Sequence, residues 1–239
     1  MEKIRTYKQM AKASLQNKWG DAAILTLVYV GIAYVVSGAF VLPIRFLSFN
    51  PCLGLIPTIF LLPLAWGYAV SFLTTVRGED VKINHLWDGY RSENIIRVFS
   101  TFLVATLIYI AVIAIFILII SIISVMVAFI SVDMMMGGAI IILSILCGFI
   151  YVYILLRWAM VYFILCDEPQ MKNTAVLKAS ARMMKGHKWQ FLKLYLSFIG
   201  WMFVGIITLG IGMLWVVPYL TTASAHFYED LKKEPIYEQ

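Results

Sequence analysis

Charged residues are scarce in this chain and are missing from long stretches of it. Only 13% of its 239 residues are Asp, Glu, Lys or Arg, whereas 62% are hydrophobic. A soluble globular domain is nearer to a quarter charged and half apolar. The composition therefore excludes an ordinary soluble domain, and we expect the surplus of apolar side chains to face lipid.

The chain also lacks the spacings that bind metals or form disulfide frameworks. No two of its cysteines form a CxxC pair and their number is odd, which argues against both kinds of site. The histidines are far apart in the sequence and show no metal-ligand spacing. We expect no metal and no cofactor. The cysteines are Cys52, Cys147 and Cys166, and the histidines are His85, His187 and His226.

Groups that would support catalysis are missing from the apolar segments as well. A membrane-embedded enzyme needs paired carboxylates, a metal cluster or an activated nucleophile, and none of these is visible in the sequence. No catalytic residue is predicted, so the sequence favours a protein that is not an enzyme. The net charge of +6 comes from basic residues that flank apolar segments, as in membrane proteins, and we expect no nucleic-acid partner.

Long apolar runs predict an all-α, polytopic transmembrane helix bundle in which residues 1–239 form a single integral membrane domain. Crossing the hydrocarbon core takes about 20 apolar residues. Between Lys193 and Glu229 the only acid or base is His226, and this run is long enough to cross, turn at a Gly-rich break and return. A count of five spans stays open, because Pro218 interrupts the last one. The six predicted spans are 22–42, 55–76, 98–130, 139–166, 189–207 and 213–227.

Lysine and arginine are distributed unevenly around these spans. With six spans, all but two of the 19 Lys and Arg residues fall on one side of the membrane, and the exceptions are Arg45 and Arg157. Cytoplasmic loops are enriched in Lys and Arg, so both termini are predicted to be cytoplasmic. The first apolar run begins only after Asp21 and is too long for a signal peptide. We therefore expect the amino terminus to be retained.

Two polar segments have the pattern of helices that lie at a membrane surface. Residues 1–20 combine basic residues with apolar side chains at helical spacing, which is typical of an interfacial amphipathic helix. A plain cytoplasmic helix is the alternative. The connector 77–97 carries Trp87 and Tyr90, which an interfacial helix would hold at headgroup depth. The apolar positions of the first segment are Ile4, Tyr7, Ala11, Leu15 and Trp19.

The connector 167–188 is predicted to form a basic amphipathic helix parallel to the membrane. Lys178, Arg182 and Lys185 share one helical face. This basic face is a candidate surface for binding anionic lipid headgroups or a partner protein. The opposite face is formed by Val176, Ser180, Met183 and Met184.

Three more residues are candidates for the same role. Arg157 stands ten residues before Asp167, which places it about 15 Å from the helix end, and a charge inside the membrane is often functional. The favoured alternative is that Arg157 lies at the headgroup boundary and reaches a lipid phosphate. His187 and Lys188, together with Lys185, are suited to bind a lipid phosphate or an acidic partner.

The carboxy-terminal part contains several short motifs. They are Lys185-Gly186-His187-Lys188, Ser197-Phe198-Ile199-Gly200-Trp201, Thr208 to Gly212, Pro218-Tyr219 and Phe227-Tyr228-Glu229. With the segments AKASLQNKWGDA and RGEDVKINHLWDGY, they resemble a bacterial membrane family, the domain of unknown function 975. The chain departs from the family pattern between Val98 and Cys166, where an Ile-Pro-Gly-Ile-like turn is missing. The resemblance implies a multi-spanning plasma-membrane protein and brings no established activity.

Two functions are consistent with these patterns. The first is a non-catalytic protein of the bacterial plasma (inner) membrane that binds anionic lipid headgroups, or an unknown membrane or cytoplasmic protein, through its basic helices. The second is a small transporter or channel subunit, since interrupted helices often line transport sites. Acids for ion coupling are missing from the spans, which argues against transport. The prolines that interrupt spans are Pro57, Pro63 and Pro218.

Overall fold

The computed structural model describes residues 2–46, 55–128, 146 and 148–234, and this part of the chain contains helices and no strand. The predicted all-α fold is confirmed for these residues. In chain order the helices are α1 (Glu2–Ser14), α2 (Trp19–Phe46), α3 (Leu55–Val76), the 3-10 helix η2 (Ile83–Tyr90), α4 (Ser92–Ala128), a helix over residues 148–157, α6 (Val161–Asp167), α7 (Asn173–Met183), α8 (Lys188–Leu196), α9 (Ile199–Ile207) and α10 (Met213–Lys232).

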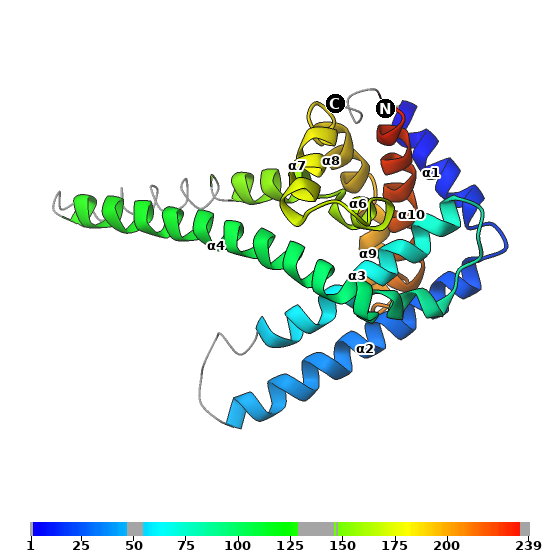
Figure 1. The fold of residues 1–239 in the computed structure, drawn as a ribbon, viewed down its shortest axis with the longest axis horizontal. Coiled ribbons are helices and arrows are strands. Elements are labelled where there is room, and N and C mark those ends of the chain that lie inside the picture. Colours follow the sequence, from blue (N-terminus) through cyan, green and yellow to red (C-terminus); the bar gives the residue numbers. More distant parts are fainter. Residues whose placement is uncertain (1, 47–54, 129–145, 147, 235–239) are drawn as a thin grey trace.

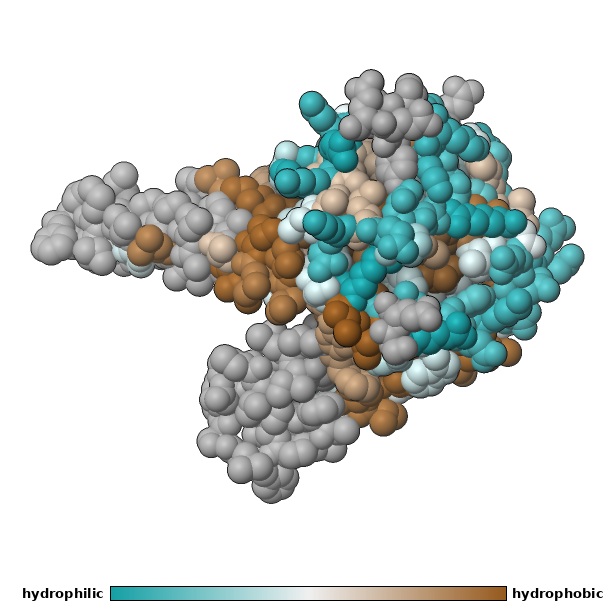
Figure 2. Space-filling view, in the orientation of Figure 1, coloured by the Kyte–Doolittle hydropathy of each residue, from teal (hydrophilic) through white to brown (hydrophobic). Residues whose placement is uncertain are grey.

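The helices form one packed cluster from which long apolar helices project (Figure 1). α1, α6, α7, α8 and α10 gather at one end of the molecule, while α4 and the pair of α2 and α3 extend away from it. Hydrophilic residues cover much of the cluster, and hydrophobic residues lie where the projecting helices leave it (Figure 2). Such a division of polar and apolar surface is typical of a protein that is partly immersed in lipid.

Three helical stretches are long and apolar enough to cross a membrane, and two more are apolar but shorter. At most 28% of the most apolar window of each long stretch is buried within the protein, so most of these apolar side chains point outward. The five stretches overlap five of the six predicted spans. Among the described residues the segment 213–227 does not meet the same criterion, and the number of spans stays a prediction. The long stretches are Trp19–Gly38, Gly148–Asp167 and Lys188–Ile207, and the shorter ones are Phe60–Val76 and Asn94–Ile108.

The second half of α10 lies at the centre of the packed cluster. Every residue from Thr222 to Tyr228 is buried, and α10 packs against α1, α2 and α3. The Phe227 ring lies 5.4 Å from the Tyr7 ring and 5.1 Å from the Phe191 ring, measured between centroids. A helix that is apolar and covered on all sides belongs to a core. This part of the predicted sixth span is therefore packed against protein in the described structure.

α1 packs on α10 through the apolar face that the sequence indicated. Tyr7, Ala11 and Leu15 are at most 5% exposed. The Tyr7 hydroxyl donates a hydrogen bond of 2.5 Å to the Asp230 carboxylate. Burial, together with this bond to an anion, raises the pKa of Tyr7. The apolar face of α1 thus contacts the protein itself, and the location of this helix at a membrane surface stays a prediction.

η2 occupies the connector 77–97 and is held against α3. Leu86 is fully buried, whereas Trp87 is 51% exposed. The Tyr90 hydroxyl donates a hydrogen bond of 2.6 Å to the backbone oxygen of Phe60. Trp87 of the connector therefore points outward, and Tyr90 attaches the connector to α3.

Two glycines allow η2 and α3 to approach each other closely. A Cβ on Gly67 would overlap the backbone oxygens of His85 and Leu86, and a Cβ on Gly89 would overlap the backbone oxygen of Pro63. Backbone atoms have little freedom to move away. The docking of η2 on α3 therefore requires glycine at both positions.

Replacing Gly67 or Gly89 by alanine is expected to destabilise the protein, because the added methyl group has to push two backbones apart. Overpacking of this kind costs on the order of 1–3 kcal/mol. Thermal unfolding in detergent, followed by tryptophan fluorescence, measures the loss. Gly31→Ala in α2 is the matched control, since a Cβ there meets nothing within 4 Å. Equal melting temperatures for Gly67→Ala and Gly31→Ala would contradict the close packing.

Candidate functional site

The candidate site is built around a turn that interrupts the chain's helical conformation directly after Arg157. The helix over residues 148–157 ends at Arg157, a turn follows, and α6 begins at Val161. The buried hydroxyl of Ser180 donates to the Arg157 carbonyl at 3.1 Å and accepts from the Met160 N–H at 3.3 Å. Ser180 thereby satisfies backbone groups that the break leaves without helical partners. The sequence predicts one uninterrupted span over 139–166, of which 139–145 and 147 lie outside the described residues, and it gives no sign of this turn.

α7 brings Ser180 to the break because one of its faces is buried. Val176 and Met183 are among the buried residues of this face, which packs against α4 and α6. Lys178 and Arg182 are exposed. The division into an apolar and a basic face coincides with the one that the sequence indicated for the connector 167–188. The fold therefore presents the basic face of α7 beside the helix end at Arg157.

Five of the six predicted binding residues line one cavity of about 580 Å³. We call these five cations, Arg157, Lys178, Arg182, Lys185 and Lys188, the basic cradle. Four of them are exposed, and Lys188 is partly buried, with its Nζ 3.5 Å from the centroid of the ring of Tyr153. The remaining lining residues of the cavity are Tyr153, Ala175 and Ala181.

The cations of the basic cradle have no acidic partner within the part of the chain that the structure describes. No ion pair in that part involves any of the five, and no acid is among the residues that line the cavity. Like charges gathered in one hollow repel each other, and an anion placed between them relieves that repulsion. Arginine and lysine together are the usual ligands of phosphate groups. The cradle is thus suited to hold a phosphate-bearing anion.

His187 is the predicted residue that the structure places elsewhere. Its Nε2 lies 3.1 Å from the Glu234 carboxylate, and it does not line the cavity of the basic cradle. The His187 side chain therefore lies outside the cavity that Lys185 and Lys188 line, and its role in binding stays a prediction. His187 connects the start of α8 with the end of α10 instead.

A second hollow, which shares helices but no lining residue with the basic cradle, is apolar. It has a volume of about 600 Å³ and is formed by α4, the segment 151–162, α7 and α8. We call it the apolar groove. Thr106 of α4 and Leu155 are two of its exposed lining residues. The other lining residues are Phe102, Ala105, Tyr151, Val152, Ile154, Leu156, Trp158, Ala159, Val161, Tyr162, Leu177, Phe191, Leu192 and Tyr195.

An ion-pair network at the carboxy-terminal end of α6 holds together the helices around the site. The Asp167 carboxylate accepts hydrogen bonds from Arg77 at 2.7 and 2.8 Å, from Lys232 at 2.7 Å and from the Tyr228 hydroxyl at 2.9 Å. Arg77 also donates to Glu229 at 2.8 Å. The network joins the ends of α3, α6 and α10. Sequence reasoning missed it, because its members are 61 to 152 residues apart.

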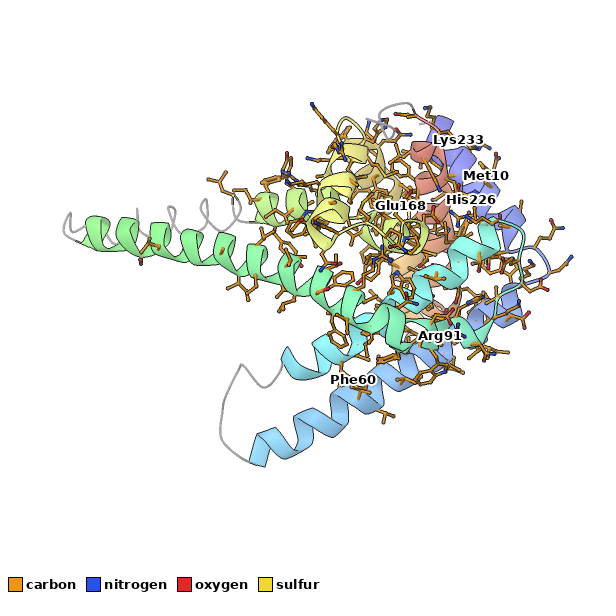
Figure 3. All side chains as sticks on the ribbon, viewed as in Figure 1. Met10, Phe60, Arg91, Glu168, His226 and Lys233 are labelled. Atoms are coloured by element: carbon orange, nitrogen blue, oxygen red, sulfur yellow. The ribbon has the colours of Figure 1, made fainter. Side chains whose placement is uncertain are left out.

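A third hollow, of about 480 Å³, lies between α1 and α10, where Met10, His226 and Lys233 are labelled in Figure 3. Acids and bases both line it, and some are paired: Arg77 donates a hydrogen bond of 2.8 Å to the Glu229 carboxylate. Its charges compensate one another, unlike those of the basic cradle. It is lined by Lys3, Thr6, Tyr7, Met10, Val76, Arg77, His226, Glu229, Asp230 and Lys233.

Ser180→Ala is expected to destabilise the protein, because it removes the partner of the buried Met160 N–H. An unsatisfied buried donor costs on the order of 1–3 kcal/mol. Unfolding by sodium dodecyl sulfate gives the change in the free energy of unfolding. Ser100→Ala serves as the control, since the Ser100 hydroxyl bonds to carbonyls of its own helix. A loss no greater than that of Ser100→Ala would show that Ser180 does not hold the break.

Comparison with known proteins agrees with the resemblance seen in the motifs. The family model DUF975, described as a protein of unknown function, matches residues 1–235. No curated protein and no solved structure matches the chain. Because the family model covers almost the whole sequence, the chain belongs to the DUF975 family of proteins of unknown function.

Proposed function

We propose that this protein is a non-catalytic, multi-pass protein of the bacterial plasma membrane that binds the phosphate headgroups of anionic lipids in its basic cradle. Both termini and the cradle lie on the cytoplasmic side in this proposal. The observation that carries it is the gathering of five cations around one cavity whose lining includes no acid.

Three features of the molecule support the membrane part of the proposal. Three helical stretches are long and apolar enough to cross a membrane. Nearly all Lys and Arg residues lie in the predicted cytoplasmic segments, as in membrane proteins of known orientation. α8, whose first residue belongs to the cradle, packs against both α1 and α10. The cradle is therefore on the same end of the molecule as the helices that begin and end the chain.

The position of the cradle favours a lipid headgroup over other anions. Lys188 is the first residue of a candidate membrane-crossing stretch, and Arg157 is the last residue of the apolar helix over residues 148–157. We therefore place the cavity at the boundary between apolar helices and the polar cluster. Anionic headgroups are concentrated at that boundary, and basic residues next to apolar helices are attracted to them. A protein partner with an acidic surface is the competing occupant.

Besides the prolines within the predicted spans, the helix break beside Arg157 favours the second candidate, a small transporter or channel subunit, because interrupted helices line transport sites. Here, however, the break is satisfied by Ser180, and Arg157 is exposed within the cradle. Phosphate flux into proteoliposomes that is lost in Arg157→Ala would favour transport. If no phosphate flux is found, or if the flux of Arg157→Ala equals that of the unaltered protein, the result argues against transport and is consistent with lipid binding.

Replacing Lys178, Arg182 and Lys185 together by glutamine is expected to reduce the anionic phospholipid that co-purifies with the protein at least fivefold. The side chains keep similar length but lose the charges that attract phosphate. The retained phosphatidylglycerol per protein, quantified by mass spectrometry after purification in a neutral detergent, is the measurement.

The matched control is the triple replacement of Lys3, Arg5 and Lys12 by glutamine, which removes the same charge from the exposed side of α1. This control should retain lipid like the unaltered protein. If the unaltered protein, the cradle variant and the control variant retain equal amounts of lipid, the proposed function is wrong. If the cradle variant loses a co-purifying protein and keeps its lipid, the occupant of the cradle is a protein partner and not a lipid.

A further inference from the structure

We propose that the basic cradle and the apolar groove together hold one anionic glycerophospholipid, with its phosphate between the cations and an acyl chain along the groove. This inference rests on the proposed function and deepens it, because it assigns a class of ligand to the site. It also predicts that the cradle recognises a whole lipid molecule and does not act only as a charged surface.

The two hollows share the end of the helix over residues 148–157. Arg157 lines the cradle, while the residues before and after it, Leu156 and Trp158, line the groove. Tyr153, one helical turn before Arg157, also lines the cradle, whereas Leu155 lines the groove. The same short segment therefore forms a wall of both hollows, with Tyr153 and Arg157 on the face toward the cradle and its other faces toward the groove.

α7 and α8 continue both walls in the same way. In α7, Leu177 lines the groove and the next residue, Lys178, lines the cradle. In α8, Lys188 lines the cradle and Leu192 lines the groove. Four residues of an α-helix rise by about 6 Å. The charged end and the apolar end are thus separated by little more than one helical turn, as are the phosphate and the acyl chains of a phospholipid.

The combination of a basic cradle with an apolar groove argues against ligands that have only a phosphate or only an apolar chain. No charged residue is among the described residues that line the groove, so a free phosphate or a sugar phosphate would leave the groove unused. A neutral lipid would fill the groove and leave five cations without a counter-ion. An anionic lipid uses both parts. The walls include the candidate membrane-crossing stretches Gly148–Asp167 and Lys188–Ile207, which places the groove where acyl chains are available.

The test uses the purified full-length chain in a neutral detergent and three probes: dioleoyl phosphatidic acid, glycerol 3-phosphate and dioleoyl phosphatidylcholine. Native mass spectrometry and ligand titration measure binding. Phosphatidic acid is expected to bind at least tenfold more tightly than either of the other probes. Glycerol 3-phosphate has the phosphate without the chains, and phosphatidylcholine has the chains without the net negative charge.

Variants of the groove separate its role from that of the cradle. Leu155→Trp fills the groove at a residue that is 52% exposed, and it is expected to weaken binding of phosphatidic acid about tenfold. Thr106→Trp, on the facing helix α4, is a second variant with the same expected effect. Leu103→Trp is the matched control, because Leu103 is 57% exposed on α4 and does not line the groove.

Two different failures are distinguishable. If Leu155→Trp and Thr106→Trp bind phosphatidic acid as Leu103→Trp does, or if glycerol 3-phosphate binds as tightly as phosphatidic acid, the groove holds no acyl chain and the inference fails. The proposed function survives that result as long as the triple glutamine variant of the cradle loses anionic lipid. If the triple variant binds phosphatidic acid like the unaltered protein, the proposed function fails together with the inference.

Discussion

The carboxylate of Asp167 holds three helices at one point, and the arrangement of the candidate site depends on it. It accepts hydrogen bonds from Arg77, Lys232 and Tyr228, and its side chain is only 5% exposed. Because this carboxylate is buried, the loss of one of its partners would leave its charge poorly compensated. α6, which ends at Asp167, is therefore fixed against α3 and α10. Because α6 has only seven residues, this anchor also fixes its position between the turn after Arg157, which Ser180 holds, and the start of α7.

Two polar regions of this protein use charge in opposite ways. Around Asp167, and in the hollow between α1 and α10, acids and bases lie together and compensate one another. Such pairs tie helices that are distant in the sequence. In the basic cradle the described residues supply charge of one sign only. The packing of α7 does not depend on Lys178 and Arg182, since its buried face consists of apolar side chains and Ser180. The concentration of cations in this one hollow is the basis of the proposed lipid site.

The sequence predicted those features that depend on local periodicity. The basic face of α7, with Lys178 and Arg182, and the buried face of α1, with Tyr7 and Ala11, follow from helical spacing alone. The apolar helices follow from composition. The closeness of Arg157 to α7 did not follow, because the helix break that brings them together contains neither glycine nor proline. It depends on a hydroxyl from another helix, 23 residues away.

Contacts between residues far apart in the sequence could not be predicted from local patterns either. His187 was grouped with its sequence neighbours, yet its side chain pairs with Glu234 at the other end of the carboxy-terminal region. The apolar groove was not predicted either, since its walls come from four separate segments. Periodicity defines which face of a helix is basic or apolar. It does not define which other helix that face will meet.

The most direct test of the account is an experimental structure of the protein in nanodiscs that contain phosphatidylglycerol. We expect density for a lipid phosphate within hydrogen-bonding distance of Arg157 and of Lys178 or Arg182. Carboxylates of this chain or of a partner protein between these cations, or a cradle whose side chains point apart with no bound anion, would contradict it.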